Sequence, residues 1–182
     1  MFKGRDVNVH IERTARTIMY GFLINIITIV ALVVSISSIT INAESPSAGL
    51  VKGLPLIDYF SAGSVILLLL LILVSAMISY MARLSTLRRE FKDARRLIHI
   101  YIIINAITAV FTATYLVRVN PLLGFWTNGL TTAAIIVPIF VVSIMVLLMI
   151  GIAAMYIGLL ALGRVEDLFR PRRKPGHSSP HP

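Results

Sequence analysis

The sequence predicts an all-α, polytopic integral membrane protein in which four transmembrane helices form a bundle. Four long apolar runs, at roughly residues 18–41, 62–82, 98–117 and 130–162, contain no Asp, Glu, Lys or Arg. Each run can supply the roughly 20 apolar residues that a helix needs to cross the ~30 Å hydrocarbon core of a bilayer. The composition agrees, because a chain that is 57% hydrophobic and 14% charged has more apolar surface than a water-soluble core of this length can bury.

We expect a single transmembrane domain over residues 1–168, followed by a disordered basic tail that is rich in Pro and His at 169–182. The expected spans are about 17–42, 61–83, 97–118 and 130–163. A cleaved signal peptide would remove the first span, but its apolar stretch is about twice the ~7–15 residues of a signal-peptide core. The chain has no cysteine, so it forms no disulfide.

The basic residues predict the orientation, because Lys and Arg accumulate in cytoplasmic loops. Fifteen of the 17 basic residues fall in the N-terminal segment, the middle connection and the C-terminal tail. They are Lys3, Arg5, Arg13, Arg16, Arg83, Arg88, Arg89, Lys92, Arg95, Arg96, Arg164, Arg170, Arg172, Arg173 and Lys174. The other two connections hold only Lys52 and Arg118. Both termini are therefore expected on the cytoplasmic side of a cell membrane.

The first and third spans each carry a stripe of small or polar residues at helical spacing. The candidates for helix packing or for lining a pore are Asn25, Thr28, Ser35, Asn105, Thr108 and Thr112. In lipid, such faces hold helices together by close backbone approach and hydrogen bonds. We expect the two helices to meet through these faces, with a hydrogen bond between the Asn25 and Asn105 amides. The alternative is that the stripes line a polar path.

The second and fourth spans carry small residues. In the second span, Ser75, Ser79 and Ala82 form a small face near the cytoplasmic end. In the fourth, Pro138 predicts a kink. The fourth span also has a stripe of small residues that predicts a tight helix crossing, within the chain or between copies. This stripe consists of Gly151, Ala154, Gly158 and Ala161.

The connection at residues 83–97 contains neither Gly nor Pro, and its apolar residues recur at steps of three and four. We expect an amphipathic cytoplasmic helix or a helical extension of a neighbouring span. The candidates for contact with anionic lipid headgroups are Arg88, Arg89, Lys92, Arg95 and Arg96. Control of membrane topology explains the same charges without a specific lipid.

The spans lack the residues that membrane chemistry needs. Enzymes and ion-coupled transporters use acids, bases, nucleophiles or metal ligands, yet the four runs contain no Asp, Glu, Lys, Arg or Cys. His99 is the only histidine near a span, and one histidine cannot supply a bis-histidine haem site. We therefore expect no catalytic residue, no cofactor and no metal site, and we expect no nucleic-acid partner.

Two hypotheses about function follow. The first is a non-catalytic scaffold or accessory subunit of a membrane assembly. The second is a pore-forming homo-oligomer that passes water, ions or small neutral solutes. The expected partners are the lipid bilayer, anionic headgroups on the cytoplasmic face, and either further copies of the chain or the subunits of a larger membrane complex.

Overall fold

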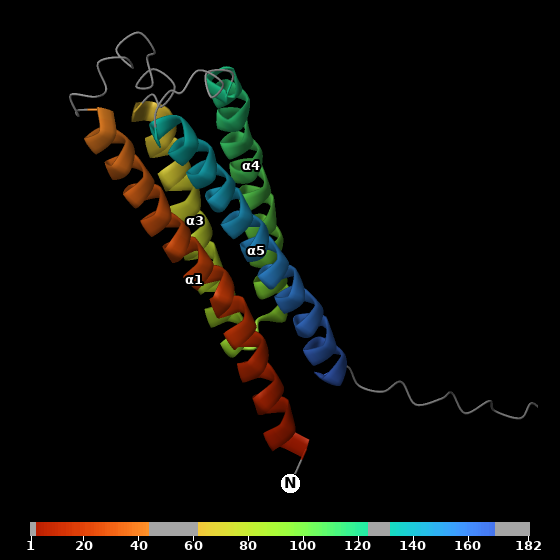
Figure 1. Ribbon diagram of the computed structural model, residues 1–182. Coiled ribbons are helices and arrows are strands. Elements are labelled where there is room, and N and C mark those ends of the chain that lie inside the picture. The colour runs from red at the N-terminus through yellow and green to blue at the C-terminus, as the bar shows by residue number, and fades with distance from the viewer. Residues whose placement is uncertain (1–2, 44–61, 124–131, 170–182) are drawn as a thin grey trace, which may run out of the picture.

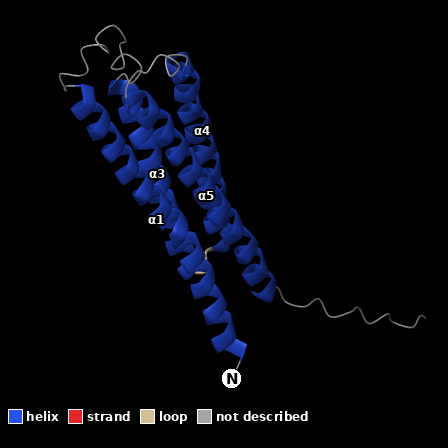
Figure 2. Cartoon of the chain, in the orientation of Figure 1, coloured by secondary structure: helices blue, strands red, loops and turns tan. Residues whose placement is uncertain are grey.

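The computed structural model describes residues 3–43, 62–123 and 132–169, and every regular element in these ranges is a helix. The helices are α1 (Lys3–Ala43), α3 (Ala62–Leu87), α4 (Phe91–Leu123) and α5 (Thr132–Phe169), drawn in Figures 1 and 2. All four are long and apolar enough to cross a membrane, which confirms the predicted helices. Most of the predicted tail, and the side chains of Ser35 and Pro138, lie outside the described part.

The helices extend beyond the apolar runs at one end of the molecule. The first helix begins at Lys3, well before the predicted span, and α5 continues to Phe169. Hydropathy marks where apolar residues stop, whereas a helix satisfies its own backbone groups and continues into water wherever no breaker intervenes. In Figure 1, α1 projects farther than the other helices at this end.

A tight turn divides the segment that the sequence predicted as one amphipathic helix or an extension of one span. The predicted helical extension is present on both sides of the turn, since α3 continues to Leu87 and α4 begins at Phe91. Arg89 has a φ of 65°, in the left-handed region. The amides of Arg89 and Glu90 donate to the carbonyls of Thr86 and Ser85 at 3.1 and 2.9 Å. This is the Schellman arrangement, in which a glycine normally takes the left-handed position.

Each of the four helices packs mainly against two others. Helix α1 packs against α3 and α5, and α4 packs against the same two helices. Helices α1 and α4 therefore lie on a diagonal, and their polar faces meet across the interior through the side chain of Tyr101 rather than through close packing of the two helices. The start of α1, the α3–α4 turn and the end of α5 lie at the same end of the bundle, which we call the basic end (Figure 1).

The interior holds two apolar clusters. The basic-end cluster consists of Ile18, Ala82, Ala94, Ile98, Tyr101, Met155 and Leu162. The distal cluster consists of Leu32, Leu68, Ile72, Ala109, Ile144 and Leu148. The outside of the helices is apolar as well, with large residues such as Ile66, Val110 and Ile157 more than half exposed. An exposed apolar surface of this extent is larger than a water-soluble monomer usually carries and fits helices that are long and apolar enough to cross a membrane.

Candidate functional site

The most distinctive feature of the interior is a polar layer between the two apolar clusters. It consists of Asn25 on α1, Ser75 on α3, Tyr101 and Asn105 on α4, and Gly151 on α5. Tyr101 belongs to both the layer and the basic-end cluster, because its ring packs in the cluster and its hydroxyl enters the layer. The side chains of Asn25, Ser75, Tyr101 and Asn105 have no solvent-exposed surface. Because an unpaired polar group in an apolar interior is costly, the hydrogen bonds of this layer decide what it can do.

Tyr101 connects the two diagonal helices across the layer. Its hydroxyl donates to the carbonyl of Gly21 at 3.2 Å and lies 3.3 Å from Asn25 Oδ1, both on α1. A Cβ on Gly151 would lie 2.8 Å from the same hydroxyl, so α5 must carry a glycine for the bridge to fit. The polar stripes of α1 and α4 are thus joined by one long side chain and not by direct helix packing.

The two asparagines do not bond to each other as the sequence predicted. Asn105 Nδ2 donates to the carbonyl of Tyr101, one turn earlier in α4, at 3.3 Å. Asn25 Nδ2, Asn105 Oδ1 and Ser75 Oγ have no hydrogen-bond partner among the described residues. The spacing of the third span places Tyr101 on the same face as Asn105, four residues earlier, but spacing alone does not reveal that its hydroxyl reaches α1.

The three threonine candidates are buried and satisfied within their own helices. Thr28 donates to the carbonyl of Ile24 at 2.8 Å. Thr108 donates to Ile104 at 2.7 Å, and Thr112 to Thr108 at 2.8 Å. All three are at most 1% exposed. Their hydroxyls therefore face the interior of a single chain.

The small residues of α3 and α5 allow close contact with α1. Ser79 Oγ donates to the carbonyl of Ile18 at 3.1 Å. A Cβ on Gly158 would lie 3.0 Å from Ile18 Cγ1, and Gly151 and Gly158 are both buried. Ala154 and Ala161, the other members of the stripe, are partly buried. The glycines of this stripe thus make their tight crossing within the chain.

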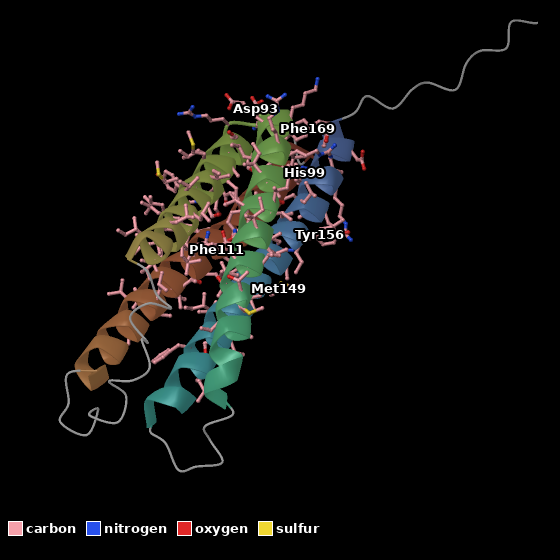
Figure 3. The ribbon with its side chains drawn as sticks, turned by 90° about the horizontal axis from the view of Figure 1, so that it is seen from above. Asp93, His99, Phe111, Met149, Tyr156 and Phe169 are labelled. Carbon is pink, nitrogen blue, oxygen red and sulfur yellow. The ribbon has the colours of Figure 1, made fainter. Side chains whose placement is uncertain are left out.

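Polar and aromatic contacts tie the helix ends together at the basic end. Arg89 Nη2 donates to Asn8 Oδ1 at 2.9 Å, and its guanidinium lies 5.9 Å from the ring centre of Phe169. The rings of Phe91 and Phe169 lie 5.4 Å apart. Figure 3 shows the start of α4, at Asp93, beside the end of α5, at Phe169. The left-handed turn, the start of α1 and the end of α5 therefore support one another.

The five candidates for anionic headgroups divide into two kinds. Arg89 is engaged with Asn8, and Arg95 forms an ion pair with Glu166 at 2.8 Å. The side chains of Arg88, Lys92 and Arg96 are exposed and make no hydrogen bond or ion pair with another described residue. An exposed ion pair such as Arg95–Glu166 contributes at most about 1 kcal/mol. The three unengaged cations are the ones that can meet an anionic surface.

Within the described ranges, no three His, Cys, Asp or Glu side chains come together in a way that could hold a metal ion. Neither a family model nor a curated protein nor a solved structure matches the chain.

We predict that Gly158→Ile destabilises the bundle by about 1–3 kcal/mol, because its side chain would collide with Ile18. Gly63→Ile is the matched control, since nothing lies within 4 Å of a Cβ on Gly63. Thermal unfolding in detergent micelles measures both variants. Equal melting temperatures for the two would contradict the assigned crossing of α5 and α1.

Proposed function

We propose that the chain is a non-catalytic four-helix membrane protein that acts as a scaffold or accessory subunit of a membrane assembly. The observation that carries this proposal is the burial of its polar residues inside a single chain. Asn25, Thr28, Asn105, Thr108 and Thr112 are at most 1% exposed. Side chains placed in this way pack among the helices of their own chain and present no chemistry to a substrate.

The same geometry argues against a pore formed by several copies. In such a pore, polar side chains face a channel axis between the chains. Here the three threonine hydroxyls are bonded within their own helices. The outward surface consists of residues such as Val30, Ile103 and Met149, so copies would meet through apolar faces. An apolar outer surface suits lipid and the helices of partner subunits.

Three outward-facing tyrosines support a position in the bilayer. Tyr20, Tyr80 and Tyr156 are each about half exposed. They lie at one level, because the rings of Phe22 and Tyr80 are 6.0 Å apart and Met155 lies against Gly21. Tyrosine gathers at the boundary between hydrocarbon and headgroups. These residues therefore form a belt at the interface nearest the basic end.

The helix lengths fit a bilayer that begins at this belt. From Tyr20 to the end of α1 at Ala43, a helix rises about 35 Å. From Tyr80 back to the start of α3 at Ala62, the rise is about 27 Å. These values lie on either side of the ~30 Å thickness of the hydrocarbon core. The charged helix ends would then project into water on the basic side.

In the proposed orientation, the chain spans the plasma membrane and its basic end lies in the cytoplasm. Exposed Arg13, Arg16, Arg88, Lys92 and Arg96 all lie at this end. Cytoplasmic loops collect Lys and Arg, and the inner leaflet is the more anionic one. In this position Arg88, Lys92 and Arg96 would contact anionic headgroups.

Labelling of single cysteines tests the orientation, since the natural chain contains none. In intact cells, a membrane-impermeant maleimide should label Lys52→Cys. It should label Glu90→Cys only after the membrane is permeabilised, because the α3–α4 turn lies at the basic end. Labelling of Glu90→Cys in intact cells would overturn the proposed topology.

Gentle solubilisation from native membranes, followed by determination of the native mass, tests the proposed function. An accessory subunit should co-purify with foreign subunits in fixed stoichiometry, and liposomes that contain the purified chain alone should show no flux. The proposal would be contradicted if the chain purified as a homo-oligomer without foreign subunits and allowed flux of water, ions or small solutes across liposome membranes. If Asn105→Leu abolished that conduction while the bundle still folded, the pore would replace the scaffold.

A further inference from the structure

We propose that the polar layer is a binding site for an internal water molecule that bridges α1, α3 and α4. The observation that supports it is that three buried polar atoms have no hydrogen-bond partner in the part of the chain that the structure describes: Asn25 Nδ2, Ser75 Oγ and Asn105 Oδ1. Each belongs to a side chain with no exposed surface. This inference goes beyond the scaffold function, because it assigns a ligand to the centre of the bundle.

These three side chains are exceptions among the buried polar residues described. The hydroxyls of Thr28, Thr86 and Thr108 each donate to the carbonyl four residues earlier. The hydroxyl of Ser79 donates to α1. Ser75 occupies the equivalent place one turn away, yet its hydroxyl makes no such bond. Buried polar groups are normally satisfied by protein or by ordered water, and protein satisfies the others here.

The contacts of neighbouring residues place the three atoms at one level of the bundle. Ser79 lies beside Gly21, since a Cβ on that glycine would be 3.2 Å from Ser79 Oγ. Helix α1 runs away from the basic end and α3 runs toward it. Asn25 therefore lies one helical turn farther from that end than Gly21, and Ser75 lies one turn farther than Ser79, so Ser75 and Asn25 are at the same level. Asn105 lies one turn farther along α4 than Tyr101, whose hydroxyl reaches Asn25. All three helices thus present a polar atom to the same layer.

The chemistry of the three atoms selects a small neutral ligand. The amide nitrogen of Asn25 can only donate, the amide oxygen of Asn105 can only accept, and the Ser75 hydroxyl can do both. The donor disfavours a cation, and the acceptor disfavours an anion. A water molecule accepts from Asn25 and donates to Asn105 and Ser75, which gives it the three hydrogen bonds typical of buried water.

The orientation of the Asn25 amide does not remove the need for a ligand. Exchanging its oxygen and nitrogen would turn the nitrogen toward the Tyr101 hydroxyl, and the oxygen would then be the atom without a partner. Asn105 cannot be reversed, because its nitrogen donates to the Tyr101 carbonyl and an oxygen there would be repelled. In either orientation of Asn25, a bridging water can form a hydrogen bond with the amide atom that does not face the Tyr101 hydroxyl.

Water-edited solid-state NMR on the full chain in liposomes tests the site directly, with water itself as the probe. Polarisation should pass from water to the side-chain amide of Asn25 and not to the backbone amide of Ile72 in the distal cluster. The exposed amide of Asn8 is the positive control, and Asn105→Leu should abolish the transfer to Asn25. The matched control is Ser79→Ala, which removes a hydroxyl already bonded to α1 and should leave the transfer intact.

Two results would overturn the proposal. An Asn25 signal that receives no polarisation, while Asn8 does, would show that the layer is dry. Transfer that extends through Thr108 and Thr112 to the distal end would show a continuous water column. That result would also contradict the scaffold function and favour the pore, whereas a dry layer would leave the scaffold function intact.

Discussion

The bundle depends on the hydrogen bond from Tyr101 to α1. Helices α1 and α4 lie on a diagonal and pack mainly against α3 and α5, so this hydroxyl connects two helices that do not pack closely against each other. The bond constrains all four helices, because Gly151 of α5 must lack a side chain to admit the hydroxyl and Gly21 must lie close enough to accept it. Hydrogen bonds between membrane helices contribute only about 0.6–2 kcal/mol each. Their main effect is to fix the relative positions of the helices, since apolar surfaces alone would pack almost equally well in several registers.

Hydropathy could predict the four helices, because charge-free runs of this length have no other stable form in a bilayer. It could not predict the helical extensions or the turn between α3 and α4. The extensions consist of ordinary polar residues, which are compatible with helix and with loop alike. The turn has no sequence signal, since an arginine occupies the left-handed position that glycine normally takes. The contacts of Arg89 with Asn8 and Phe169, far away in sequence, help to hold it there.

The polar residues of the interior could be recognised from their spacing, because steps of three and four place Asn25 and Thr28 on one face of α1 and Asn105 and Thr108 on one face of α4. Their partners could not be recognised in the same way. Periodicity shows which residues share a face, but the order of helices around the bundle decides which faces meet. Asn25 and Asn105 do not bond to each other, and the side chain that reaches α1 from α4 is that of Tyr101. Whether the glycines of α5 pack within the chain or between copies was likewise open until the contact of Gly158 with Ile18 was known.

The central claim is that these faces pack inside one chain, and a disulfide tests it most directly. A Cβ on Gly158 lies 4.0 Å from the Cα of Ile18, which suits a disulfide between Ile18→Cys and Gly158→Cys. The measurement is the mass of the product after mild oxidation in native membranes, with Ile18→Cys combined with Ile157→Cys as the control, because Ile157 faces outward. The account predicts a bond within the monomer for the first pair and none for the second. Covalent dimers formed by the first pair, or no bond at all, would contradict it.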